Sequence, residues 1–219
     1  MDNGALEVKD LTFSYGEKQV LCHFDLSIAQ GEWVAIMGKS GCGKSTLLSN
    51  ICGLAQKIEG ATYQGKISLF GKEIESYSRS ELAKTIGVVF QNASNRLVAP
   101  TVEEEIWFGL QNLCLDKKEI IDRADKVIQE LGLEKVRKDN PSRLSGGQQQ
   151  LVSFGAVVAM MPKIYLFDEV TSQFDTTNRN LVLEKIRRLN QEGATIIMVE
   201  HSTLVSENAQ RKIVLEGLK

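Results

Sequence analysis

The segment GKSGCGKS carries the residue types that bind a phosphate chain. It covers residues 38–45 and fits the pattern G-x-x-x-x-G-K-[ST]. Its glycines allow backbone N–H groups to turn toward β- and γ-phosphate oxygens, Lys44 adds a mobile positive charge, and the Ser45 hydroxyl can bind Mg²⁺. An apolar run precedes the segment and a helical pattern follows it. That context disfavours a glycine-rich turn that binds nothing, so the sequence predicts a nucleotide-phosphate site.

Two acidic residues follow another apolar run, in KIYLFDE at residues 163–169. A buried strand that delivers Asp168 and Glu169 to its carboxyl end is costly unless a cation or ligand binds there. We expect Asp168 to hold Mg²⁺, directly or through water, and Glu169 to polarise an attacking water molecule. The alternative is a strand that runs out into a solvated acidic turn, and the phosphate-binding segment disfavours it.

Two kinds of strand pattern surround these motifs. Residues 6–13 and 20–28 alternate apolar and polar positions, which predicts an antiparallel lobe with one solvated face. Continuous apolar runs, typical of strands covered on both faces, predict a buried parallel sheet. These runs are residues 33–37, 86–90, 164–167 and 195–199. Since helical patterns alternate with the runs, we predict an α/β fold with a P-loop NTPase core and a mainly parallel sheet.

Helical patterns begin with capping signals and dominate the middle of the chain. An acceptor side chain followed three residues later by glutamate predicts a capping box. The three pairs are Ser78 and Glu81, Thr101 and Glu104, and Asp116 and Glu119. Residues 92–161 contain no strand candidate, which indicates an inserted α-helical subdomain. We predict one domain over residues 1–219, with the nucleotide-binding core and β lobe at 1–91 and 162–219.

Composition excludes several classes of protein. The 219 residues carry 26 Lys+Arg and 28 Asp+Glu, a net charge of -2, so we expect no nucleic-acid partner. Four cysteines at irregular spacings, without a CxxC pair, favour a reducing cytosol over a disulfide framework or a zinc site. The N-terminus lacks a signal-peptide pattern, and no stretch approaches the roughly 18 apolar residues of a membrane span. We therefore expect membrane contact only through partners.

Further motifs stand in order around the two sites. LSGGQ occupies residues 144–148, between the phosphate-binding segment and the acidic pair. Tyr15 stands in FSYG, Gln91 in VVFQ, Asp175 in TSQFD and His201 in VEHS. With these motifs in this order, nearly the whole chain resembles the nucleotide-binding domains of ABC transporters, the ATP-binding-cassette ATPases.

The resemblance implies a role for each motif. Glu169, Gln91 and His201 would be catalytic, and Ser45, Gln91 and Asp168 would bind Mg²⁺. Glutamine can orient water, and histidine can donate a hydrogen bond to the γ-phosphate. The residues expected to contact ATP are Tyr15, Gly38, Ser40, Gly41, Cys42, Gly43, Lys44, Ser45, Thr46, Ser145, Gly146, Gly147, Gln148 and Asp175.

Each assignment has a structural alternative. Gln91 can be a polar residue at a strand end, Asp175 a helix cap, and His201 a satisfied structural side chain. Tyr15 can simply pack beside Phe13 on one face of a strand. The order of the motifs favours the functional interpretation of all four.

The resemblance also implies partners. In the family two domains face each other head to tail, and ATP lies between the phosphate loop of one and the signature LSGGQ of the other. Ser145 and the N–H groups of Gly146 and Gly147 can approach a γ-phosphate only because no side chain intervenes. The phrase VVFQNASNRLVAPTVEEEIWFGL is most similar to ATPases of energy-coupling-factor importers for vitamins and metal ions. Transmembrane subunits would then hold the protein at the cytoplasmic face of the membrane, with residues 91–108 beside a docking groove.

The sequence departs from the family pattern outside its phosphate and metal ligands. Leu151 and Ala156 stand where many members carry arginine, and Val170 where proline is usual after the paired acids. Gln173 and Phe174 replace a small residue and leucine.

Two other functions stay open: a soluble ABC ATPase acting on nucleic acid or ribosomes, and a weakly catalytic half of a heterodimer. The anion-binding loop would favour the thiolate form of Cys42. The simpler interpretation is that Cys42 is a small residue that fits the loop.

Overall fold

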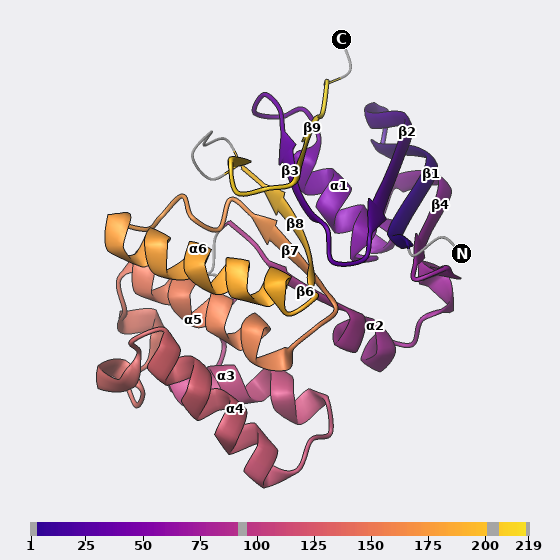
Figure 1. The fold of residues 1–219 in the computed structure, drawn as a ribbon. Helices are drawn as coiled ribbons and strands as arrows, with labels where there is room; N and C mark the ends of the chain where they lie inside the picture. The colour runs from indigo at the N-terminus through magenta and orange to yellow at the C-terminus, as the bar shows by residue number, and fades with distance from the viewer. Residues whose placement is uncertain (1–3, 92–95, 201–205, 218–219) are drawn as a thin grey trace.

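The computed structural model describes residues 4–91, 96–200 and 206–217, which form two β-sheets with helices packed around them (Figure 1). The first sheet is antiparallel, with four strands in the order β2-β1-β4-β5. Its strands are β1 Gly4–Tyr15, β2 Lys18–Ala29, β4 Ala61–Leu69 and β5 Lys72–Glu73. The predicted antiparallel lobe is confirmed, and β4 and β5 add to it two strands that the sequence analysis did not identify.

The second sheet is parallel, with five strands in the order β6-β7-β8-β3-β9. Its strands are β3 Trp33–Met37, β6 Ile86–Val89, β7 Ile164–Asp168, β8 Thr195–Val199 and β9 Arg211–Val214. The four continuous apolar runs account for four of these strands, which confirms the predicted parallel sheet. The edge strand β9 was missed, because three of its four residues are exposed and its sequence RKIV has no continuous apolar run.

The described part of the chain contains six α-helices (Figure 1). They are α1 Lys44–Ile51, α2 Arg79–Thr85, α3 Val102–Asn112, α4 Lys117–Glu130, α5 Gly146–Met160 and α6 Thr176–Gln191. Helix α4 lies away from the parallel sheet, packed on α3 and α5, which also pack on each other (Figure 1). Residues 96–161 contain no strand, as expected, while the division of the chain at 92 and 161 stays a prediction.

Alternate side chains of the parallel strands enter two separate cores. Val34, Leu166 and Ile197 join α1 and the antiparallel sheet, whereas Trp33 and Tyr165 join the core formed with α3 to α6. Successive side chains of a strand point to opposite faces, so a strand covered on both faces must be apolar throughout. This packing fixes the carboxyl ends of β3, β6 and β7 as a common rigid edge.

The capping predictions hold at the acceptor side chains and differ in the returning bond. Ser78 forms the complete reciprocal box with Glu81. Thr101 and Asp116 also accept from the backbone N–H three residues on. The carboxylates expected to return a bond have other donors, since Glu104 accepts from the Thr101 hydroxyl and Glu119 pairs with Arg123. No helix among the described residues is both long and apolar enough to cross a membrane.

Gly87 tests the close contact between β6 and the end of α5. A Cβ atom at this position would lie 2.6 Å from Val157 Cγ1 and 2.7 Å from Pro162 Cγ. We expect Gly87→Ala to lower the free energy of unfolding by about 1–3 kcal/mol, because overpacking forces a shift of backbone or side chains. Urea denaturation measures the change. Gly4→Ala is the matched control, since nothing lies within 4 Å of its added Cβ; equal stabilities of the two variants would contradict the packing.

Candidate active site

The phosphate-binding segment lies between the end of β3 and the start of α1. Gly43 caps α1 with φ 104°, and an added Cβ would lie 3.1 Å from Val20 Cγ1. A Cβ on Gly38 would lie 2.5 Å from the backbone oxygen of Leu215, in the segment that follows β9. Glycine is therefore required at both ends of the loop, once for a left-handed backbone and once for close approach.

The Lys44 side chain is held against the backbone of the phosphate-binding segment. It is buried, and Nζ donates to the backbone oxygens of Gly38 and Lys39, each at 2.9 Å. Nζ also lies 3.9 Å from the buried Cys42 Sγ. The loop thus carries a pre-positioned cation at its centre, where the amino end of α1 adds the positive end of its dipole.

Asp168 places a carboxylate beside this loop at the end of β7. The residue is 5% exposed, and its Oδ1 atom has no hydrogen-bond partner among the described residues. Burial raises the pKa of the Asp168 carboxyl; the Ser45 hydroxyl opposes that rise, and the neighbouring Glu169 charge adds to it. A buried carboxylate oxygen without a partner, next to a serine hydroxyl, suits a hard cation such as Mg²⁺, which binds few protein ligands in addition to substrate phosphates.

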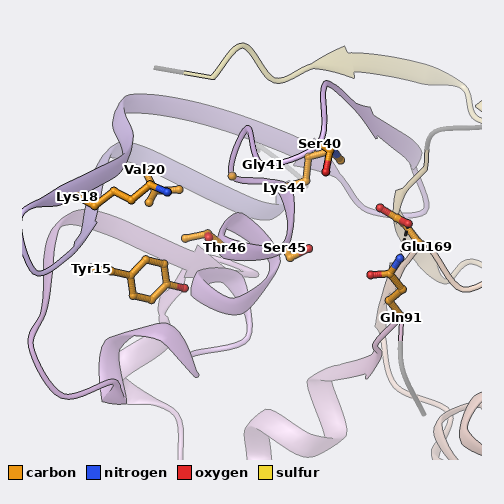
Figure 2. A pocket seen from close by; sticks show the side chains of 11 residues that line it. Tyr15, Lys18, Val20, Ser40, Gly41, Lys44, Ser45, Thr46, Gln91 and Glu169 are labelled. Atoms are coloured by element: carbon orange, nitrogen blue, oxygen red, sulfur yellow. Dashed lines mark hydrogen bonds between the residues drawn. The ribbon is translucent and has the colours of Figure 1, made fainter. Parts of the chain in front are cut away.

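Glu169 and Gln91 come together across neighbouring strands. Gln91 follows β6 and Glu169 follows β7, and Gln91 Nε2 donates to Glu169 Oε2 at 2.7 Å (Figure 2). Glu169 has φ 48°, a left-handed conformation that is uncommon for a side chain of this size, and its N–H donates to Val199 O at 3.0 Å. Such conformations persist where the surrounding structure enforces them, and they concentrate at functional sites.

A cleft of about 390 Å³ joins these groups to the antiparallel lobe (Figure 2). Its lining residues are Tyr15, Lys18, Val20, Ser40, Gly41, Gly43, Lys44, Ser45, Thr46, Gln91 and Glu169. Nine of these eleven were predicted from sequence, and Lys18 and Val20 were missed. The signal was available: Tyr15 pairs with Lys18 across the hairpin, and the two-residue period of a strand places Val20 on the same face as Lys18.

Tyr15 closes the end of the cleft far from Glu169 (Figure 2). The residue is 38% exposed, and its ring stands edge-on to Phe13, with 4.9 Å between ring centroids and 83° between ring planes. Phe13 is fully buried and so fixes one edge of the tyrosine. A flat aromatic surface remains available for a planar ligand.

The signature segment is well formed but lies outside this cleft. Ser145 caps α5 and forms a reciprocal box with Gln148, while Gly146 and Gly147 are the first residues of the helix. Asp175 caps α6 and accepts from the N–H of Asn178 at 2.8 Å. None of these residues lines the cleft of its own chain.

The remaining predicted residues are accounted for separately. Gly38, Cys42 and Asp168 belong to the phosphate loop or its floor but do not line the cleft. His201 lies outside the described residues. Leu151, Val170 and Phe174, at three of the positions that depart from the family pattern, are buried in the core shared by α3 to α6, and Ala156 packs against it.

Comparison with known proteins agrees with this arrangement. The family model described as ABC transporter matches residues 21–172, most of the chain. The chain belongs to the ABC transporter family of ATP-binding-cassette ATPases. It therefore has the ATP-binding fold that the sequence predicted.

Individual relatives cover nearly all of the chain. An "Energy-coupling factor transporter ATP-binding protein EcfA" of Methanosarcina acetivorans is 36% identical over 221 residues, covering 97% of this chain and 79% of the relative. A "Putative ABC transporter ATP-binding protein" of the same organism is 36% identical and covers 98% of this chain, which spans only 34% of that relative's length. The structure titled "Dimeric structure of a post-hydrolysis state of the ATP-binding cassette MJ0796 bound to ADP and Pi" matches with TM-score 0.84 and 29% identity, covering 96% of this chain and 94% of the other.

Asp168→Asn tests the cost of the buried carboxylate. The pKa of the Asp168 carboxyl is raised in the fold above the ordinary aspartate value of 3.8. The contribution of this group to the free energy of unfolding therefore falls as pH rises above 3.8. Without nucleotide or Mg²⁺, we expect the variant to be more stable than wild type by about 1 kcal/mol at pH 7, with the difference shrinking as pH falls toward 4.

Urea denaturation at a series of pH values measures this difference. Asp122→Asn, at an exposed position on α4, is the control and should track wild type. A variant that is less stable than wild type at pH 7 would contradict the desolvation of Asp168.

Proposed function

We propose that this chain is the ATP-hydrolysing subunit of an energy-coupling-factor importer for a vitamin or a metal ion. The observation that carries the ATP-hydrolysing part of the proposal is the hydrogen bond of Gln91 to Glu169 in the cleft that Lys44 also lines. Binding residues and a poised carboxylate therefore occupy one cleft. The printed name of the EcfA relative supports the kind of transporter.

ATP would lie along the cleft with its base at Tyr15 and its phosphates in the loop. The exposed face of Tyr15 would stack on adenine, and Lys18 would lie beside the ribose or phosphates. Loop N–H groups and the amino end of α1 would bind phosphate oxygens, with Ser40, Gly41, Gly43 and Thr46 lining the wall. The Lys44 ammonium would leave its two backbone carbonyl partners and bind the γ-phosphate instead.

Ser45, Asp168 and Gln91 would hold Mg²⁺ beside these phosphates. When bound, the ion neutralises charge on the phosphate oxygens and so assists phosphoryl transfer. For this chain, its binding would relieve the cost of the buried Asp168 carboxylate.

Glu169 would act on the attacking water. Its carboxylate accepts the water proton as the oxygen attacks the γ-phosphorus, and the bond to the β-phosphate oxygen breaks to leave ADP and phosphate. The Gln91 amide fixes the orientation of that carboxylate through the 2.7 Å bond. His201, assigned by resemblance, would donate to the γ-phosphate.

A second ATPase domain would complete the site. In one chain the signature residues Ser145 to Gln148 and Asp175 stand outside the cleft, and Gly146 and Gly147 at the amino end of α5 carry no side chains of their own. A head-to-tail partner would present these donors to the γ-phosphate. The printed name of the dimeric structural neighbour bound to ADP and Pi supports a second domain.

The membrane subunit would dock beside α3. A hollow of about 380 Å³ is lined by Val98, Ala99, Pro100, Glu104, Trp107, Phe108 and Gln111. Val98 and Phe108 are 72% and 53% exposed, which gives the hollow an apolar surface suited to a helix from a transmembrane partner. This partner would hold the ATPase at the cytoplasmic face of the membrane.

Glu169→Gln tests the hydrolytic role. We expect kcat for ATP to fall at least about 100-fold, because glutamine cannot accept the water proton, while ATP affinity is retained. The slow variant should accumulate as an ATP-bound dimer in size-exclusion chromatography. Phosphate release and nucleotide titration measure the two effects.

Glu184→Gln provides a matched control on the exposed side of α6, where the carboxylate pairs with Arg187 and Arg188. It should keep wild-type turnover. Undiminished hydrolysis by Glu169→Gln would remove Glu169 from its proposed role.

A further inference from the structure

Gln173 lies where three segments of the proposed mechanism meet. Its Nε2 donates to the backbone oxygen of Gln91 at 3.3 Å. A Cβ atom placed on Gly146 would lie 3.4 Å from Gln173 Oε1, and one on Gly147 would lie 3.4 Å from Gln173 O. One residue thus lies beside both the start of α5 and the segment that follows β6.

The backbone around Gln173 is fixed by short turns and by its neighbour. The N–H of Ser172 donates to Glu169 O at 3.1 Å, and the N–H of Phe174 donates to Thr171 O at 3.3 Å. The Phe174 side chain is 4% exposed in the helical core. Gln173 is therefore anchored at a set distance from Glu169.

Two amides hold the segment that carries Gln91. Gln150, on α5 and fully buried, donates from Nε2 to Phe90 O at 3.0 Å. Gln173 donates to the next carbonyl along the chain, that of Gln91. The Gln91 side chain then reaches Glu169 Oε2 at 2.7 Å. Successive carbonyls are thus fixed from α5 and from the turn after β7.

We propose that Gln173 is a positioning residue that holds Gln91 against Glu169 and links the start of α5 to the hydrolysis site. The inference rests on the proposed ATPase function and adds a residue outside the family's usual pattern at this position. Because Gly146 and Gly147 lie against Gln173, movement of the α5 N-terminus shifts Gln173, and its amide carries that shift to Gln91. Engagement of the signature segment by a partner's nucleotide is in this way coupled to the orientation of Glu169.

The side-chain amide resonance of Gln91 reports this contact without any turnover. In isotope-labelled protein it is identified by its loss in Gln91→Ala. We expect Gln173→Leu, which keeps bulk but removes the donor, to shift this resonance, and Gln191→Ala, at the far end of α6, to leave it in place. A Gln91 resonance unchanged by Gln173→Leu would overturn the inference.

Kinetics then test whether Gln173 acts through Gln91. Gln173→Leu should lower kcat about tenfold and change KM for ATP less than about twofold, because orientation is lost while ATP binding remains. In a Gln91→Ala background the same substitution should cost less than about twofold more. A full further tenfold loss in that background would contradict action through Gln91. Wild-type protein without ATP turnover would contradict the proposed function instead, and the resonance would still decide the role of Gln173.

Discussion

The burial of a carboxylate at the end of β7 is the constraint around which the rest of the site is arranged. Asp168 is 5% exposed and precedes a second acid, Glu169, so a buried carboxylate has a further negative charge beside it. Neighbouring groups offset this cost in part: Lys44 from the loop after β3, the Ser45 hydroxyl at the start of α1, and the Gln91 amide after β6. The same groups are those that a nucleotide phosphate chain requires. Sheet order brings these groups together. Strand β6 lies beside β7, and only β8 stands between β7 and β3.

Local sequence patterns predicted the elements better than their contacts. Continuous apolar runs identified β3, β6, β7 and β8, since a strand covered on both faces is apolar at nearly every position. The edge strand β9 was not predicted because RKIV is mostly exposed to solvent. Strand β4 was not predicted because Gly65 and the polar residues beside it interrupt the strand pattern. The residues proposed to bind phosphate form a motif that is contiguous in sequence, so they could be identified without the structure. The Gln91 to Glu169 bond was not, because it joins residues 78 positions apart and depends on strand order.

The helical segment supplies what the nucleotide cleft does not contain. Its signature residues begin α5 with a complete capping box, and α5 packs on α3, which also lines the hollow proposed for the membrane partner. One rigid packing unit thus carries both a proposed γ-phosphate clamp and a proposed docking surface. A buried carboxylate supports that surface: Glu105 accepts from the N–H groups of Val98 and Ala99 at 2.8 and 2.7 Å. The departures at Leu151, Val170 and Phe174 fall in the core of this unit and leave the polar groups of the cleft intact.

We propose that one chain holds ATP but hydrolyses it only when a second domain completes the site. The decisive measurement is the rate of phosphate release per chain with saturating ATP and Mg²⁺ over a wide range of protein concentration. We expect the rate per chain to rise with protein concentration and then level off as dimers form. A rate per chain that stays constant down to the lowest measurable concentration, with monomers confirmed by light scattering, would contradict it.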